Sequence, residues 1–193
     1  MFKKIVIISR AVENITDENL VKLVQDGDNE QFGHLVERYE AKMLSYARKF
    51  LFDSENAKDM VQEVFIKAYV NIASFDLSKK FSPWLYRIAH NCFINEIKKT
   101  TRERSFVVSV DVFFPELFSK DEPDREIIDN ELRASLDDSI SKVDIKYREV
   151  LVLYYFQELN YKEIADVLHI PVPAVGIRLS RGKKLLRKFM TNE

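Results

Sequence analysis

Apolar residues recur at three- and four-residue steps along most of this 193-residue chain, and this periodicity restricts the fold more than any other feature. Such spacing is typical of amphipathic helices that bury one face. Only four glycines and five prolines interrupt it. The sequence therefore predicts an all-α protein.

Helix punctuation predicts where the helices of the first half begin. Thr16 is expected to cap a helix that stops at Gly27, and a second periodic run follows over 28–51. Asp53 or Ser54 is expected to open a third helix. Ser82 followed by Pro83 predicts an N-cap with proline at the first position of a fourth helix. These four helices are expected to close one small domain.

The middle of the chain breaks the helical pattern and divides the protein. It contains "FVVSVDVFF", which could form a strand but has no evident partner, so an extended connector is predicted. Helices return after it. The expected division is an N-terminal extension (1–15), a first helical domain (16–104), a linker (105–125) and a second helical domain (126–193).

Two short helices near the C-terminus have the spacing of a helix-turn-helix. Asn160 and Glu163 form a capping-box pattern at the start of the first, which ends at His169. His169 occupies the turn, where a positive φ is expected, so it is predicted to be a turn residue and not a ligand. The second helix is expected to begin near 171–173 and to reach about Met190.

The net charge of −1 conceals three blocks of opposite sign. Residues 78–104 hold seven basic residues and two acidic ones, residues 105–145 hold four basic and eleven acidic, and residues after 160 hold seven basic and three acidic. Basic blocks of this kind attract nucleic acid, and the acidic middle predicts an acidic linker between the two basic blocks.

Enzyme chemistry finds no support in the sequence. Glycine-rich phosphate-binding motifs are absent, the three histidines lie far apart in the sequence, and none of them has metal-ligand spacing with Cys92, the lone cysteine. No catalytic residue, metal or cofactor is therefore expected. The apolar stretch near the N-terminus, Ile5–Ile8, is too short for a signal or spanning segment, so a cytoplasmic protein without direct membrane insertion is predicted.

The helix-turn-helix is the first positive indication of function. Its second helix would enter the major groove of duplex DNA while basic side chains hold phosphates. An ordinary solvated helix face is the alternative. The candidate DNA contacts are Ala174, Arg178, Arg181, Lys183 and Lys184.

The segment "FSPWLYRIAHNCFINEIKK" with its preceding loop mixes aromatic, amide and basic residues, a combination that suits single-stranded nucleic acid. Trp84 fits a core position better than an exposed stacking platform. The outward face is expected to carry Tyr86, Arg87, His90, Asn91, Asn95, Lys98 and Lys99, with Lys79 and Lys80 on the loop.

The helix that begins at Ser54 directs Asp59, Gln62, Glu63 and Ile66 away from its apolar stripe. A solvated face explains the acids alone, but an outward isoleucine among them favours a protein-docking surface.

Three stretches in this order resemble the extracytoplasmic-function (ECF) sigma factors of bacterial RNA polymerase. They are "NAKDMVQEVFIKAYVNIASF", "SPWLYRIAHNCFINEIKK" and "KYREVLVLYYFQELNYKEIADVLHIPVPAVGIRLSRGKKLLRKF". The resemblance implies that the first domain, sigma region 2, binds the melted −10 element, and that the second, sigma region 4, binds the −35 element. A regulator that binds DNA without polymerase and a sigma-like adaptor are the alternatives.

The resemblance also assigns roles and partners. RNA polymerase core and promoter DNA are the implied partners, and an anti-sigma factor is a further candidate. Asp59, Gln62 and Glu63 would dock on polymerase, and the acidic linker would follow its RNA path. The loop 76–81 with Lys79 and Lys80, together with Arg87, Asn91, Asn95 and Lys98, would contact the −10 strand, and the helix Val172–Lys188 the −35 duplex.

One stretch departs from the family pattern. Where the family has Gly-Thr-Val-Lys-Ser in the recognition helix, this chain has Pro173, Ala174, Val175, Gly176 and Ile177. Glycine inside a helix costs about 1 kcal/mol relative to alanine, and here it also removes a basic contact.

Overall fold

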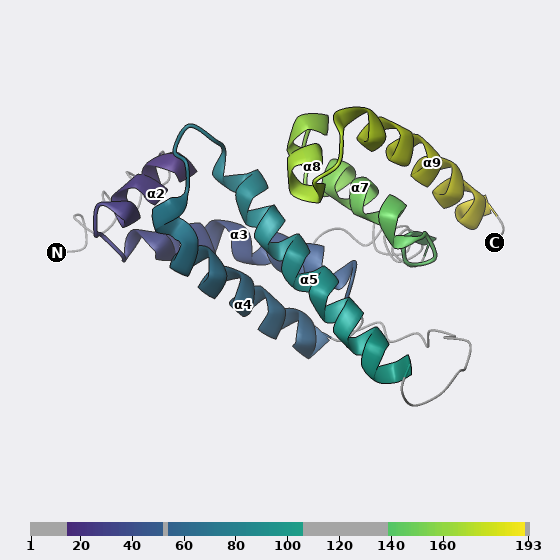
Figure 1. Ribbon diagram of the computed structural model, residues 1–193, viewed down its shortest axis with the longest axis horizontal. Coiled ribbons are helices and arrows are strands. Elements are labelled where there is room, and N and C mark those ends of the chain that lie inside the picture. Colours follow the sequence, from purple (N-terminus) through teal and green to yellow (C-terminus); the bar gives the residue numbers. More distant parts are fainter. Residues whose placement is uncertain (1–14, 52–53, 106–138, 192–193) are drawn as a thin grey trace, which may run out of the picture.

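The computed structural model describes residues 15–51, 54–105 and 139–191 (Figure 1). Over these residues all regular elements are helical and no strand occurs, which confirms the predicted all-α fold. The stretch "FVVSVDVFF" and residues 1–14 lie outside the described residues. The elements are α2 (Asp17–Gln25), α3 (Gln31–Arg48), α4 (Ser54–Asn71), the short 3₁₀ helix η1 (Ile72–Ser74), α5 (Phe81–Ser105), α7 (Ile145–Tyr155), α8 (Tyr161–Leu168) and α9 (Val172–Thr191).

Local capping explains where several helices begin. Thr16 Oγ1 accepts a hydrogen bond from the Asn19 amide at 3.3 Å and starts α2. The Asp144 side chain caps α7. Asn160 and Glu163 form the predicted capping box of α8, in which Glu163 Oε2 accepts from the Asn160 amide at 2.9 Å. These caps satisfy backbone amides that have no partner inside the helix.

The start of α5 differs from the sequence prediction. The helix begins at Phe81, two residues before Pro83, so Ser82 is not its N-cap. The Phe81 amide instead donates to Glu18 Oε1 at 3.0 Å, and the Phe81 ring is fully buried. Pro83 still lies in the first turn, where a missing N–H removes no intrahelical bond. A contact with a residue 63 positions away therefore sets this boundary.

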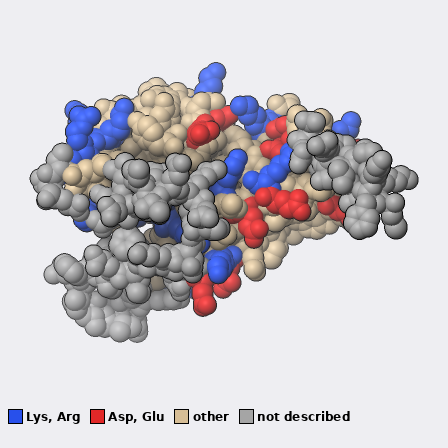
Figure 2. Space-filling view, turned by 180° about the vertical axis from the view of Figure 1, so that it is seen from behind, with Lys and Arg blue, Asp and Glu red and all other residues tan. Residues whose placement is uncertain are grey.

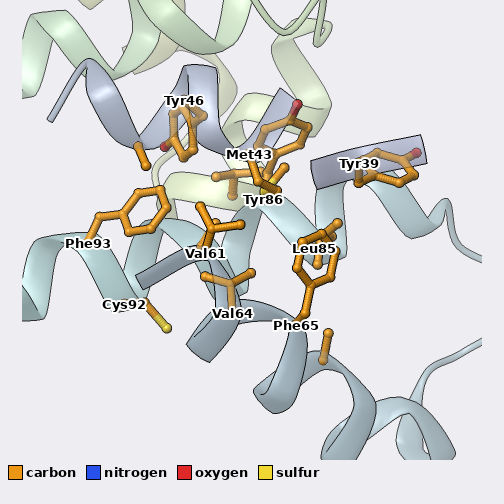
Figure 3. Packing of buried hydrophobic residues seen from close by; sticks show 14 of the residues in the cluster. Tyr39, Met43, Tyr46, Val61, Val64, Phe65, Leu85, Tyr86, Cys92 and Phe93 are labelled. Atoms are coloured by element: carbon orange, nitrogen blue, oxygen red, sulfur yellow. The ribbon is translucent and has the colours of Figure 1, made fainter. Parts of the chain in front are cut away.

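Helices α3, α4 and α5 enclose the core of the first helical group (Figure 3). Met43, Val64 and Leu85 come from these three helices in turn, and each is 0 % exposed. The Tyr46 ring meets Phe93 with centroids 5.5 Å apart. Aromatic contacts of this kind stabilise a core beyond the area that they bury.

The second group is α7, α8 and α9, and it lies against α5 (Figure 1). Lys80 Nζ forms an ion pair with Glu163 Oε1 at 2.8 Å, and the Tyr86 hydroxyl donates to Gln157 Oε1. The prediction that Tyr86 faces outward is wrong, because the second group covers it and leaves it 1 % exposed. One side of α5 thus lies in the core and another lies against the second group.

Replacing each of two glycines of α9 with alanine should change the free energy of unfolding in opposite directions. At Gly176 an added Cβ would meet only Tyr161 Cε2, at 3.5 Å, so Gly176→Ala should raise the free energy of unfolding by about 1 kcal/mol. At Gly182 an added Cβ would lie 3.1 Å from two atoms of buried Leu151, so Gly182→Ala should lower it. Urea denaturation measures both, and an equal gain in the two variants would contradict the packing of α9 on α7.

Candidate nucleic-acid interfaces

A cleft of about 300 Å³ opens between α4, η1 and α5. Its walls combine amide groups, a lysine and an indole ring, a mixture that can pair with base edges and stack on their faces. Of the predicted binding residues, Asn91 and Asn95 line it. The lining residues are Lys67, Asn71, Ser74, Trp84, Ile88, Asn91, Cys92 and Asn95.

Lys67, Asn71 and Ser74 of this cleft were not predicted from the sequence. Lys67 Nζ lies 2.6 Å from Glu63 Oε1 and 3.4 Å from Cys92 Sγ, which holds the ammonium group at the cleft. Asn71 Nδ2 donates to the Lys67 carbonyl at 2.7 Å. The available signal was the four-residue spacing of Lys67 and Asn71 immediately before the aromatic and basic loop, which places both on one face of α4.

Trp84 serves both the core and the cleft. Its ring packs on Phe75 at 5.2 Å and on Phe81 at 5.6 Å between centroids, and it is half-buried against the core. The predicted core position is therefore confirmed. The part of the side chain that lines the cleft is held rigidly by these rings.

The loop before α5 is ordered by its own hydrogen bonds. Asp76 Oδ1 accepts from the amide and the hydroxyl of Ser78, at 3.0 and 2.7 Å. These bonds favour the ionised carboxylate and lower the pKa of Asp76. Lys79 and Lys80 are exposed on this loop, although Lys80 is engaged by Glu163 of α8.

The remaining predicted −10 contacts lie on α5 in different environments. Asn91, Asn95 and Lys98 are exposed. Arg87 is half-buried, and its Nε atom is buried without a hydrogen-bond partner among the described residues. Such an unsatisfied buried donor is unusual in a folded protein.

The outward side of α4 carries the surface that the sequence indicated. Asp59, Gln62 and Glu63 are exposed, and Ile66 is 62 % exposed. Val70, one turn further along, is 71 % exposed. Two large aliphatic side chains beside acids are typical of a protein-docking surface.

The helix-turn-helix is formed by α8 and α9 with a tight turn between them. His169 adopts the left-handed conformation, with φ 51° and ψ 45°, which confirms its predicted turn role. Figure 2 shows Lys and Arg side chains gathered at the end of the molecule that α9 forms. Arg181, Lys183 and Lys184 are exposed there, and Ala174 is half-buried.

Arg178 differs from the other predicted −35 contacts because it turns toward a carboxylate of its own chain. Its Nη1 atom lies 4.0 Å from Glu149 Oε2, and its side chain is 31 % exposed. His90 of α5 approaches the same carboxylate, with Nε2 3.9 Å from Oε1. The prediction that His90 faces outward is wrong, because α7 places Glu149 over it.

Burial sets the charge state of this cluster of His90, Glu149 and Arg178. Desolvation raises the pKa of Glu149 to about 7, and the nearby Arg178 opposes the rise. Desolvation likewise lowers the pKa of His90 to about 4. At neutral pH the histidine is thus neutral and the carboxylate is close to its midpoint. The other charged groups that act on the pair are Lys98, Asp144, Arg148 and His169.

Neither a metal site nor a membrane span is found in the described residues. No group of three His, Cys, Asp or Glu side chains in them could hold an ion. Over the same residues, no helix combines the length and the apolar character needed to cross a membrane.

Comparison with known proteins identifies the chain in two steps. The family model for Sigma-70 region 2 matches residues 35–103, and the model for Sigma-70 region 4 matches residues 133–186. The first match covers α3 to α5 and the second covers α7 to α9 almost completely. The chain therefore belongs to the sigma-70 family.

Relatives narrow this class. The ECF RNA polymerase sigma factor SigW of Bacillus subtilis is 38 % identical over 87 % of this chain and 93 % of its own. The structure of CnrH with the cytosolic domain of CnrY is similar over 92 % of this chain and 98 % of that one, with 26 % identity and a TM-score of 0.68. Sigma factor RpoE of Bartonella quintana, in complex with the anti-sigma factor NepR, shares the fold over 84 % of this chain and 98 % of its own, at 17 % identity and a TM-score of 0.71. The protein is an ECF RNA polymerase sigma factor, a transcription initiation factor and not an enzyme.

The buried Glu149 predicts a pH dependence of stability. Its pKa rises from the ordinary 4.5 to about 7 on folding, so the folded state binds more protons, and stability is lost as pH rises from 4.5 through 7. Glu149→Gln stays neutral and escapes this loss. Its stability relative to the wild type should rise by about 1 kcal/mol between about pH 6 and pH 8.

Chemical denaturation at a series of pH values measures this difference. Glu40→Gln, on an exposed position of α3, is the matched control. A Glu149→Gln difference that does not change with pH would show that the carboxylate is ionised throughout.

Proposed function

We propose that this sigma factor directs core RNA polymerase to promoters by binding DNA at two places. Helix α5 would bind a melted −10 strand, and α9 would bind the −35 duplex. The observation that carries the proposal is the cleft between α4 and α5, which has amide and lysine groups beside an ordered basic loop. It lies in the part of the chain that matches Sigma-70 region 2. We also propose the domain division that the sequence predicts, with a first helical domain (16–104), a linker (105–125) and a second helical domain (126–193).

The cleft suits one unstacked base. Asn91, Asn95 and Asn71 offer amide donors and acceptors to a base edge, and Trp84 offers part of an aromatic wall. The exposed Lys79 and Lys98 would meet phosphates, and the half-buried Arg87 stays a predicted contact of the −10 strand. A paired base inside a duplex cannot enter such a cleft, so these groups favour melted DNA.

The surface of α9 suits duplex DNA. The capping box fixes α8, and the left-handed His169 directs α9 away from it, which is the arrangement that places a second helix in the major groove. Arg181, Lys183 and Lys184 would then hold phosphates on either side of the groove.

The outward side of α4 is the proposed polymerase-docking surface. Ile66 and Val70 would be buried by the partner, and Asp59 and Gln62 would form polar contacts around them. Burial of these aliphatic side chains would give affinity, and the acids would select a basic partner surface.

We further infer a cytoplasmic protein that an anti-sigma factor holds inactive. The relatives support this: RpoE is seen with the anti-sigma factor NepR, and CnrH with the cytosolic domain of CnrY. The acidic composition of residues 105–125 suits a linker that occupies the RNA path of polymerase, because its negative charge resembles that of nucleic acid.

Binding of both promoter elements requires the two helical groups to separate. The −10 and −35 elements lie about 25 base pairs apart, or roughly 85 Å of duplex. Here α8 contacts α5, and α9 contacts α8. Packed helices lie about 8–10 Å apart, and the 25-residue α5 is only about 37 Å long. The present arrangement therefore cannot bind both promoter elements at once.

The double variant Asn91→Ala, Lys98→Ala should reduce promoter opening at least tenfold. Asn91→Ala removes a base contact worth about 1–3 kcal/mol, and Lys98→Ala removes a phosphate contact that is worth less. Association with core polymerase should not change, since both residues lie away from the α4 docking surface. Permanganate footprinting reports opening, and native gels with core polymerase report association.

A second pair of variants completes the design. Asp59→Ala with Gln62→Ala should weaken association with core polymerase and leave binding of an isolated melted −10 strand intact. If either pair weakened both activities equally with unchanged melting temperature, the two surfaces would not be separate. Absence of promoter-specific transcription with core polymerase would refute the proposed function and favour the adaptor.

A further inference from the structure

The outward stripe of α9 changes character along its length. Val175, Leu179 and Gly182 are buried and define the inner side of the helix. Because helical residues three and four apart share a face, the opposite side carries Pro173 and Ile177 first, and polar residues after them. The later outward residues are Ser180, Arg181, Lys184 and Lys188.

The first part of this stripe is apolar and open to solvent. On this stripe Ile177 is 55 % exposed and Pro173 is also exposed, and Val172, which precedes Pro173 at the helix end and lies outside the stripe, is 40 % exposed. Gly176, beside Ile177, has no side chain that could shield it. We call Val172, Pro173 and Ile177 the apolar tip.

We propose that the apolar tip, through Ile177, reads the C5-methyl group of thymine in the major groove and so makes thymine a requirement of the upstream promoter element. The inference rests on the proposed function, because it assumes that α9 enters that groove. Thymine alone among the four bases presents a methyl group there, and apolar side chains select it by contact. The N-terminal residues of a recognition helix are the ones that reach base edges.

The charges next to the apolar tip favour DNA over a protein as its occupant. Arg181 and Lys184 follow Ile177 on the same stripe, one and two turns further along, and both are exposed. The whole of α9 contains no acidic residue. A ligand that covers Ile177 must therefore present small apolar groups flanked by negative charge, as thymine methyls between phosphates do.

The expected size of the preference for thymine follows from the burial of one methyl group. Burying one such carbon strengthens binding about fourfold. The apolar tip thus supplies base preference, and the cations supply most of the affinity, which is independent of sequence.

The test begins with holoenzyme assembled from the full chain and core polymerase. A promoter library randomised over the upstream element is selected for binding, and the selected duplex is then made with deoxyuridine in place of each thymine in turn. Deoxyuridine lacks only the methyl group. We expect wild-type holoenzyme to bind at least one such duplex about fourfold more weakly.

Ile177→Ser provides the second arm, and its exposed position should leave the melting temperature unchanged. This holoenzyme should bind thymine and deoxyuridine duplexes equally, at the level of wild type on deoxyuridine. Lys184→Ala is the matched control, because it should weaken both duplexes by the same factor and reduce the salt dependence.

The possible outcomes distinguish a failure of the thymine proposal from a failure of the proposed sigma-factor function. The inference is wrong if no thymine is selected, if deoxyuridine binds as well as thymine, or if Ile177→Ser keeps the discrimination; the last result would assign the apolar tip to a protein partner. Transcription from the selected promoters would still support a sigma factor in each of these cases. Failure to initiate at any promoter would overturn both.

Discussion

The burial of α5 on two sides is the constraint on which the rest of this structure depends. One side, through Leu85 and Ala89, is part of the core formed with α3 and α4. Another side, through Tyr86 and His90, lies against the second helical group. The side between the cleft and solvent is left for Asn91 and Asn95. The core contacts with α3 and α4 fix the rotation of α5, so its amide groups keep their position relative to the loop before it even when the second group separates.

In the proposed DNA surfaces, charged side chains supply affinity, and amide and apolar side chains supply base preference. The net charge of −1 is uninformative, because exposed cations gather on α9 and on the loop before α5, whereas the buried carboxylate of Glu149 is placed between the two helical groups. Exposed cations give affinity that falls with salt and carries little sequence information. Selection of particular bases must come from the amides of the cleft and from the apolar tip of α9. On the proposal made above, glycine at 176 and isoleucine at 177 change what α9 reads and do not abolish reading.

The sequence predicted what local chemistry decides. Thr16 and the Asn160–Glu163 pair cap helices through neighbours two or three residues away, and His169 needs only its own backbone to turn the chain. Features that depend on distant residues were missed. The start of α5 is set by Glu18, Tyr86 is covered by a loop 71 residues away, and Arg178 meets Glu149 only because α7 packs on α9. The cleft was half predicted, since Asn91 and Asn95 lie on one helix but Lys67 and Asn71 join them through tertiary packing.

We propose that α5 and α9 bind DNA elements too far apart for the packed arrangement, so that the second helical group leaves α5 in the promoter complex. The distance between Glu40 of α3 and Asp166 of α8 tests this most directly, because both side chains are exposed and outside the proposed DNA contacts. Fluorescence energy transfer between dyes on encoded non-natural amino acids at these positions measures it. The account predicts a short distance in the free protein and an increase of tens of ångströms with core polymerase on a promoter. An unchanged distance in complexes that initiate transcription would contradict it.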